Sequence, residues 1–227
     1  MPIILSNIRE YLKGIRDIIK FTPVYKKYRQ YTMVPEKEYI ECLAIASRIE
    51  NLEGCIVECG VWRGGMVAGF GEILGNDKAY FLFDSFEGLP PAKEIDGEAA
   101  LAWQREVNSP GYFDNCKAEM KWAEDAMKKS SVTKYKLIKG WFENTVPLYK
   151  FDEKIALLHL DADWYDSTMI CLEHLFPQVI KGGIVILDDY YLWEGCRKAT
   201  HDYLSKYSVS VSILQYNNGN IHYFIKS

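Results

Sequence analysis

Two pairs of aspartates stand where two apolar segments of the chain end. Asp161 and Asp163 follow one predicted strand, and Asp188 and Asp189 follow the next. The carboxyl ends of parallel strands meet at one edge of a sheet, which is where open α/β sheets bind ligands. Carboxylates that close together repel, so either some are protonated or a cation lies among them. Oxygen-only ligands favour Mg²⁺, Ca²⁺ or Mn²⁺ over Zn²⁺, although such acids can also be helix caps or solvated loop residues.

A glycine-rich turn follows the first predicted strand, which spans residues 55–60. In the pattern Glu58-x-Gly60-x-x-x-Gly64-Gly65, the glycines let the backbone approach a ligand, and the following helix offers free N–H donors. The spacing differs from the G-x-G-x-x-G of dinucleotide-binding folds, and an acid inside the turn would repel a pyrophosphate. Glu58 therefore suits a ligand with a positively charged or hydroxyl-bearing end.

An acid also ends the second predicted strand, which runs through apolar residues to Phe83 and then reaches Asp84 and Ser85. A carboxylate at this place can bind both hydroxyls of a ribose. The alternative is that Asp84 only caps the next turn.

The spacing of apolar residues predicts an α/β fold in which five strands alternate with helices before a terminal hairpin. The strands are expected at 55–60, 79–83, 135–141, 155–161 and 184–188, and the hairpin segments at 209–216 and 221–227. The helices are expected at 3–21, 36–51, 61–74, 98–106, 115–129, 167–180 and 194–207. The last of them is expected to turn Cys196, Ala199, Leu204 and Tyr207 inward. This order predicts a doubly wound, seven-stranded, Rossmann-like sheet.

Three local signals set the predicted boundaries of these elements. Pro23 is expected to end the first helix, because a proline removes a helical hydrogen bond. Ser167 is expected to be the N-cap of the helix that follows the first aspartate pair. Gly182-Gly183 is expected to form the turn before the fifth strand.

The chain is predicted to have an N-terminal part, residues 1–52, and an α/β domain, residues 53–227. The first helix is amphipathic and basic, and its apolar residues at helical spacing are Ile4, Ile8, Tyr11, Leu12, Ile15, Ile18 and Ile19. It could lie on an anionic membrane, but we favour packing on the α/β domain or on a second subunit of a homodimer or larger homo-oligomer. A mobile basic and aromatic arm is expected at 25–35.

Residues 90–134 interrupt the alternation of strands and helices and are predicted to include a lid over the acceptor site. A connection this long is usually functional. Its tryptophans, Trp103 and Trp122, could floor a substrate pocket or form a subunit contact.

The charge and composition exclude several classes of function. The formal net charge of −4 at pH 7 argues against general nucleic-acid binding. The apolar runs fall short of the ~18–20 residues that span a bilayer, and the N-terminus has no secretory signal. The six cysteines lack the paired spacing of zinc sites. We therefore expect a cytoplasmic protein without stable membrane insertion.

A parallel doubly wound sheet whose last strand enters antiparallel is the arrangement of class I S-adenosylmethionine-dependent methyltransferases. The acids after strands one and two favour that cofactor over NAD. Six segments also resemble the macrocin O-methyltransferases and their relatives that act on aminocoumarin and macrolide antibiotic sugars. The segments are TM (32–33), VECGVWRGG (57–65), FDSFEGLP (83–90), KGWFENTVP (139–147), LHLDADWYDST (158–168) and GGIVILDDY (182–190).

The resemblance implies methylation of a sugar hydroxyl that depends on S-adenosylmethionine and Mg²⁺. By position, it implies that Glu58, Gly60 and Trp62 contact the methionine end of the cofactor and that Asp84 and Ser85 contact its ribose. It also implies that Trp141 and Phe142 lie near the adenine. The arm residues Thr32 and Met33 are implied to cover the cofactor. The implied metal ligands are Asp161, Asp188 and Asp189, with Asp161 also the catalytic base. Cys59, Ala162 and the segment 90–134 depart from the family's pattern.

The proposed chemistry gives the metal a task, since a sugar hydroxyl is too weak an acid to react at pH 7. A vicinal diol bound to Mg²⁺ becomes more acidic, and Asp161 could accept its proton. His159 is interpreted as a core histidine, and Asp163 is left outside the ligand set as either a ligand or a residue that orients Asp161.

Two other functions remain open at this stage. An NAD-dependent oxidoreductase shares the sheet and the acid after strand two, but the glycine spacing disfavours it. A binding module on a methyltransferase fold is the non-enzymatic alternative. The acceptor itself could be a natural-product glycoside, a sugar of a surface polysaccharide or a nucleotide sugar.

Overall fold

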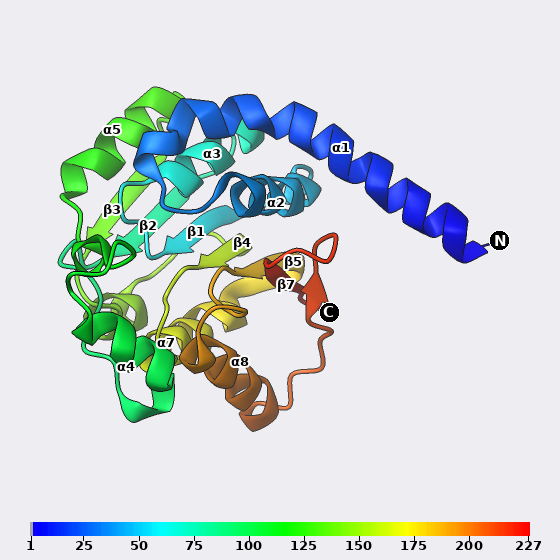
Figure 1. Cartoon of the computed structure of the whole chain (residues 1–227). Coiled ribbons are helices and arrows are strands. Elements are labelled where there is room, and N and C mark those ends of the chain that lie inside the picture. Colours follow the sequence, from blue (N-terminus) through cyan, green and yellow to red (C-terminus); the bar gives the residue numbers. More distant parts are fainter. Residues whose placement is uncertain (1) are drawn as a thin grey trace.

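The protein contains one mixed sheet of seven strands in the order β3-β2-β1-β4-β5-β7-β6 (Figure 1). The structure is a computed structural model that describes residues 2–227, with side chains from residue 12 onward. The strands are β1 (Cys55–Cys59), β2 (Tyr80–Asp84), β3 (Tyr135–Lys139), β4 (Ile155–Leu160), β5 (Val179–Leu187), β6 (Leu214–Gln215) and β7 (His222–Ile225). The first five strands are parallel, and β7 is antiparallel to β5 and β6. The predicted fold class is confirmed.

Helices cover both faces of the sheet (Figure 1). They are α1 (Pro2–Tyr28), α2 (Glu36–Ala46), α3 (Gly65–Leu74), α4 (Glu98–Arg105), α5 (Met120–Ser130), α6 (Phe142–Thr145), α7 (Tyr165–Leu175) and α8 (Glu194–Lys206). One face packs against α1, α2, α3 and α5, and the other against α7 and α8. Because both faces are covered, all residues of β1 and β4 are buried, which explains why these strands are nearly continuous apolar runs.

Register decides which side chains face each layer. Ile56, Leu157 and Ile184 lie side by side in the core with α2 and α3. The next positions along the three strands pack against α7 and α8 instead, as the two-residue period of a strand requires. Glu58 and His159 are register partners on the α2 and α3 side, so two polar side chains interrupt an otherwise apolar layer.

The first helix is longer than predicted, because α1 continues through Pro23 to Tyr28. A proline costs one helical hydrogen bond, but burial of Phe21 and Tyr28 on either side of it holds the helix together. The expected arm is therefore helical up to Tyr28, and Tyr31 is also buried. The side chains of Ile4, Ile8 and Tyr11 lie outside the described part of the chain.

Two predicted boundaries on the other side of the sheet were also wrong. Helix α7 begins at Tyr165, because Asp96 accepts a hydrogen bond from its backbone N–H at 2.7 Å and so replaces Ser167 as the cap. Gly182 and Gly183 lie inside β5, where the register with β4 shifts.

The inward face of α8 differs from the prediction at one position. Cys196 and Ala199 are buried as expected, but Tyr203 is buried while Tyr207 is 48% exposed. The reason is the helical period, since Tyr203 lies four residues after Ala199 and so on the same face.

The interruption at 90–134 has two parts. Helix α5 packs against α3 and β3, so it belongs to the helical layer of the sheet. Residues 90–119 remain as the extra segment, and the prediction of a lid now concerns this part alone.

Candidate active site

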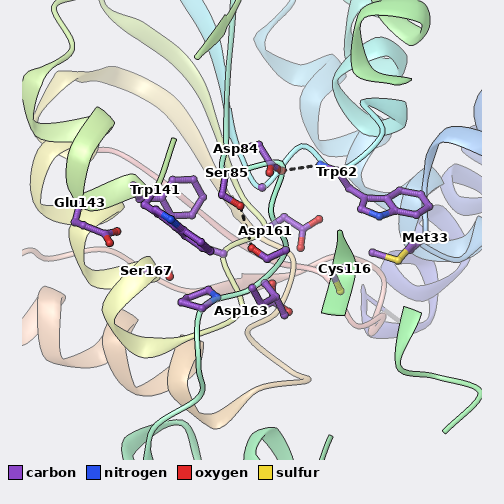
Figure 2. Close-up of a pocket in the computed structure, with 16 residues that line it drawn as sticks. Met33, Trp62, Asp84, Ser85, Cys116, Trp141, Glu143, Asp161, Asp163 and Ser167 are labelled. Carbon is purple, nitrogen blue, oxygen red and sulfur yellow. Dashed lines mark hydrogen bonds between the residues drawn. The ribbon is translucent and has the colours of Figure 1, made fainter. Parts of the chain in front are cut away.

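A pocket opens at the carboxyl ends of β1, β2 and β4. Met33 and Trp62 lie on one side of it and Trp141 and Glu143 on the other, with Asp161 between them (Figure 2). Seven of the nine predicted cofactor contacts line it: Met33, Gly60, Trp62, Asp84, Ser85, Trp141 and Phe142. The sequence motifs thus converge on one cavity.

The turn after β1 fits tightly against the end of β4. Gly60 has a φ of +86°, and a Cβ on it would lie 1.7 Å from the carbonyl oxygen of Asp161. Only glycine can occupy this position, because both the backbone conformation and the contact exclude a side chain. A Cβ on Gly65 would similarly lie 2.5 Å from the carbonyl oxygen of Tyr31. The two glycines therefore let β4 and the arm close around the pocket.

Asp84 joins the turns that follow β1 and β2. Its Oδ2 accepts hydrogen bonds from the backbone N–H groups of Val61 and Trp62 at 2.7 and 2.8 Å, and its Oδ1 accepts one from Phe86 at 2.6 Å. Burial raises the pKa of Asp84, and these hydrogen bonds oppose the rise. A carboxylate has about four acceptor positions, so Asp84 can cap the turn and still bind a hydroxyl in the pocket.

The predicted contacts Thr32 and Glu58 do not line this pocket. The Thr32 hydroxyl accepts a hydrogen bond from the backbone N–H of Val34 at 3.1 Å, which shapes the arm that presents Met33. Glu58 is 1% exposed, and its Oε1 lies 3.0 Å from Nδ1 of His159. Its position inside β1 directs the side chain into the layer beneath α2 and α3, away from the pocket.

Three carboxylates meet beside the pocket. Oxygens of Asp161, Asp163 and Asp189 lie within 4.8 Å of one another, and the backbone N–H of Asp163 donates to Oδ2 of Asp189 at 2.9 Å. Such an all-oxygen set fits a hard divalent cation. The structure therefore groups Asp163 with Asp161 and Asp189, whereas the sequence left Asp163 outside the ligand set.

Mutual repulsion and burial dominate the electrostatics of this cluster. Burial raises the pKa of Asp161 well above its usual range, and the neighbouring aspartates raise it further. The same two causes raise the pKa of Asp189. Burial raises the pKa of Asp163 to about 7, although a hydrogen bond involving Trp193 opposes the rise. A bound cation would remove this repulsion, which is the physical reason that the cluster suits one.

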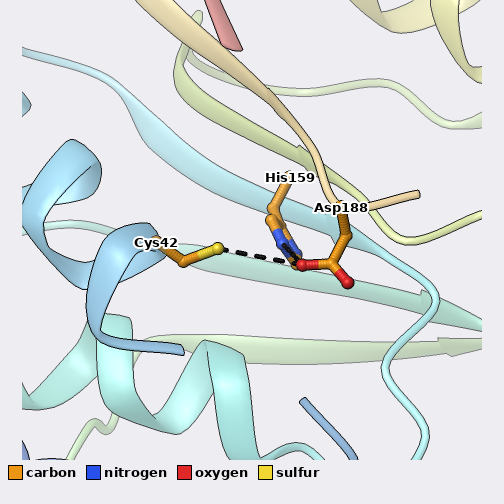
Figure 3. Close-up of side chains that lie close together, drawn as sticks. All are labelled: Cys42, His159 and Asp188. Carbon is orange, nitrogen blue, oxygen red and sulfur yellow. Dashed lines mark hydrogen bonds and ion pairs between the residues drawn. The ribbon is translucent and has the colours of Figure 1, made fainter. Parts of the chain in front are cut away.

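Asp188 belongs to a different set of contacts. Its Oδ1 lies 3.7 Å from Nε2 of His159 and accepts a hydrogen bond from the Cys42 thiol at 3.8 Å. In Figure 3, both side chains point at the same oxygen of Asp188, and its other oxygen points away. Its predicted role as a metal ligand stays a prediction.

Several residues that line the pocket were missed in the sequence. Gly88, Leu89 and Pro90 form one wall, and they lie within a recognised motif whose glycine and proline could have pointed to a pocket. Cys116 also lines the pocket, but it comes from the segment 90–119 and carries no local signal.

Hydrogen bonds from the segment 90–119 hold the wall that Gly88, Leu89 and Pro90 form. Asn115 and Leu89 exchange hydrogen bonds, from the Asn115 amide to the Leu89 carbonyl at 2.8 Å and from the Leu89 N–H to the Asn115 carbonyl at 3.0 Å. The Gln104 amide donates to the Asn115 side chain and to the Pro90 carbonyl at 3.0 and 2.9 Å. The segment 90–119 therefore fixes the shape of this side of the pocket.

Known proteins share this architecture. The O-methyltransferase NovP superposes with a TM-score of 0.69 at 26% identity, over 87% of this chain and 82% of that one. The calicheamicin methyltransferase CalS11 superposes with a TM-score of 0.63 at 20% identity, over 91% and 92% of the two chains. The second likeness concerns the fold alone.

Sequence comparison finds related O-methyltransferases. Mycinamicin III 3''-O-methyltransferase of Micromonospora griseorubida is 29% identical over 80% of this chain and 72% of its own. Demethyldecarbamoylnovobiocin O-methyltransferase of Streptomyces niveus is 30% identical over 76% of this chain and 66% of its own. The chain thus spans about two thirds to three quarters of the length of these relatives.

The family comparison covers the whole of the described pocket. The model of the family Macrocin-O-methyltransferase (TylF) matches residues 26–223, a stretch that runs from the end of α1 to β7. Together with the shared sheet and the pocket at its carboxyl edge, the match shows that this chain belongs to the macrocin O-methyltransferase family and is an O-methyltransferase.

Proposed function

We propose that the protein transfers a methyl group from S-adenosylmethionine to a hydroxyl of a sugar or sugar-bearing natural product, in a reaction that requires Mg²⁺. The observation that carries the proposal is the meeting of Asp161, Asp163 and Asp189 beside a pocket lined by the predicted cofactor contacts. The related enzymes named for mycinamicin and novobiocin substrates support an acceptor of this class.

The pocket residues have separate tasks toward the cofactor, which supplies an electrophilic methyl group on a sulfonium. Asp84 and Ser85 bind the ribose hydroxyls, and Trp141 and Phe142 pack against the adenine. Gly60 and Trp62 border the methionine end, with Met33 covering it from the arm. These tasks agree with the position of all seven residues along one cavity.

Asp161 and Asp189 of the carboxylate cluster would hold the divalent cation, with Asp163 or Asp188 as the third acidic ligand. When bound, the cation would make a coordinated hydroxyl of the acceptor more acidic. Asp161 is the catalytic base that accepts the proton of that hydroxyl, since it belongs to the carboxylate cluster and also lines the pocket, within reach of a hydroxyl bound there. A vicinal diol would present two oxygens to the site, and we propose it as the acceptor group.

The segment 90–119 is the part that we assign to the acceptor. It supplies Cys116 to the pocket, and its Trp103 contacts Trp164 and Trp193 with ring centroids 6.4 and 6.2 Å apart. Trp164 and Trp193 are only 2% and 9% exposed, so this packing fixes the segment on the α/β domain.

A direct assay of methyl transfer tests the proposal. The protein is incubated with S-adenosylmethionine and a panel of sugars and glycosides that carry vicinal diols, and S-adenosylhomocysteine is measured by mass spectrometry. Transfer is expected with Mg²⁺, is lost in EDTA and returns when Mg²⁺ is restored. Asp161→Asn is expected to slow transfer about 10²–10⁴-fold without weakening S-adenosylhomocysteine binding, while exposed Asp152→Asn has no effect.

The outcome also separates the two other functions. Calorimetric binding of NADH without binding of S-adenosylhomocysteine would support an oxidoreductase. Binding of S-adenosylhomocysteine without transfer to any member of the panel, whatever the cation, would support a binding module. Full activity of Asp161→Asn would contradict the role of Asp161 as base.

We further propose that the protein forms a homodimer through α1. Leu12, Ile15, Ile18 and Ile19 lie on one face of α1, with 54%, 37%, 54% and 71% of their surfaces exposed. Figure 1 shows this part of α1 projecting from the sheet and its helices. An exposed apolar stripe on a long helix is a typical protein contact.

The charge of the helix around this stripe favours a second copy of the chain as the partner. The first 31 residues are basic while the whole chain is acidic, so α1 of one copy is attracted to the body of another. No helix among residues 2–227 combines the length and apolar character needed to cross a bilayer. We place the protein in the cytoplasm on the cysteine pattern alone.

A further inference from the structure

A line of buried polar groups runs across the three central strands, next to the carboxylate cluster. Glu58 on β1 contacts His159 on β4 at 3.0 Å, and His159 lies 3.7 Å from Asp188, which directly follows β5. The strands are neighbours in the sheet, so the contacts link their carboxyl ends at one level. Figure 3 shows the His159–Asp188 end of this line together with Cys42 of α2.

The sheet does not need these polar groups for its stability. His159 is 0% exposed and Glu58 is 1% exposed, and their neighbours on the same face are Ile56, Leu157 and Ile184. Burial of an acid and an imidazole costs free energy that apolar side chains at these positions would not. The polar pair is therefore expected to have a task beyond packing.

Each contact of His159 is directional. Phe70 packs edge-on against the ring with centroids 5.4 Å apart, so the ring has little freedom to rotate. With Nδ1 facing Glu58, Nε2 must face Asp188. Nε2 has no hydrogen-bond partner within 3.5 Å among the described residues, and the polar groups beside it are Asp188 at 3.7 Å and the Cys42 thiol.

Only one of the two carboxylate oxygens of Asp188 contacts side chains of the interior. His159 and Cys42 approach its Oδ1, its backbone N–H donates to the Leu160 carbonyl at 3.0 Å, and its side chain is 16% exposed. One oxygen is thus engaged in the interior while the other remains available at the rim. A carboxylate that binds a metal through one oxygen is commonly oriented through the other.

We infer that Glu58 and His159 are positioning residues that fix the orientation of Asp188 and thereby set the affinity of the carboxylate site for its divalent cation. The inference rests on the proposed function, and it gives Glu58 a task toward the metal side of the site in place of a contact to the cofactor. Cys42 assists from α2 by donating its thiol to the same oxygen.

Cation binding measured apart from activity tests the inference. Mg²⁺ is titrated by calorimetry, and Mn²⁺ by its paramagnetic resonance signal, in the presence of S-adenosylhomocysteine. His159→Phe keeps a ring of similar shape but removes both nitrogens. It is expected to weaken cation binding about ten- to a hundredfold and to change the affinity for S-adenosylhomocysteine by less than about twofold. His174→Phe, on the exposed side of α7, is the matched control and should match the wild type.

A second variant covers the case in which His159→Phe does not fold because it leaves Glu58 buried without a partner. Glu58→Leu/His159→Phe replaces both groups by apolar side chains, a change that preserves folding in many cores. The expected result is a folded protein with the same loss of cation affinity. Cys42→Ala should give a smaller loss in the same direction.

The inference is overturned if the folded double variant binds Mg²⁺ as tightly as the wild type. It is also overturned if the variants lose affinity for S-adenosylhomocysteine and keep that for Mg²⁺, because Glu58 would then serve the cofactor. A wild-type protein that binds neither Mg²⁺ nor Mn²⁺ would overturn the proposed metal-dependent function together with this inference.

Discussion

At the scale of single residues, the site depends on side chains that serve the fold and the pocket together. Asp84 has backbone N–H groups on both of its oxygens and also lines the pocket. The sequence left two roles open for it, a ribose contact and a turn cap. The structure shows the cap, and the remaining acceptor capacity of the carboxylate allows the contact.

Asp84→Asn tests this double role. The new amide donor would face at least one backbone N–H that has lost its acceptor, which costs about 1–3 kcal/mol of unfolding free energy. The pocket would also distort, so S-adenosylhomocysteine should bind more weakly. Urea unfolding and calorimetry measure the two effects, with exposed Asp152→Asn as control. Unchanged stability would mean that the hydrogen bonds to Asp84 contribute little.

At the scale of elements, the close approach of the β1 turn to the end of β4 brings the cofactor contacts next to the carboxylates. Gly60 is the contact point, since its φ is positive and its Cα faces the carbonyl of Asp161. Helix α7 shows the same dependence on a distant segment, because Asp96 determines where it begins. Neither the contact between Gly60 and Asp161 nor that between Asp96 and the start of α7 can be deduced from spacing along the chain.

Gly60→Ala should therefore be far more damaging than an ordinary glycine substitution. Gly75→Ala is the matched control, because Gly75 also has a positive φ of +75° but has nothing within 4 Å of an added Cβ. The control should lose about 1–3 kcal/mol for the backbone conformation alone, because φ +75° with ψ −166° is a region that essentially only glycine occupies. Gly60→Ala should lose at least twice as much, or fail to fold, as measured by thermal and urea unfolding. Equal losses would show that β4 moves away without cost.

At the scale of the whole molecule, the apolar residues of the sheet and its covering helices are mostly buried, whereas part of α1 exposes apolar side chains. Phe21 and Tyr28 are buried and anchor the second half of α1. This agrees with one of the two predicted arrangements, in which the first helix packs on the α/β domain. Residues 12–19 of the same helix carry the exposed stripe of leucine and isoleucines. Since the arm that carries Met33 follows directly after α1, a partner on this helix would also steady one wall of the pocket.

Ile18→Lys/Ile19→Lys tests the proposed dimer. Two charges on the stripe should convert a dimer into a monomer, because burying unpaired lysines at an interface is costly. Light scattering or sedimentation measures the mass in solution. Leu148→Lys places a charge on another exposed apolar residue, 75% exposed and away from α1, and should leave the mass unchanged. A wild-type monomer at all concentrations would contradict the proposal.

The sequence by itself determined the class of fold and the rim at which the site lies. Apolar runs that end in acids predict buried parallel strands, and parallel strands bring residues such as Asp84 and Asp161 to one edge whatever the loops do. The family motifs added the residues of the pocket, and seven of the nine predicted cofactor contacts do line it.

Only the tertiary structure decided which of the four aspartates lie together and which one has other partners. Asp161, Asp163 and Asp189 meet, while Asp188 turns toward His159 and Cys42. The sequence could not show this, because the difference depends on a few ångströms in the loops after β4 and β5. It also could not show that Glu58 faces His159, since that contact requires the register of β1 against β4. Strand periodicity gives the face of a side chain, and only packing gives its partner.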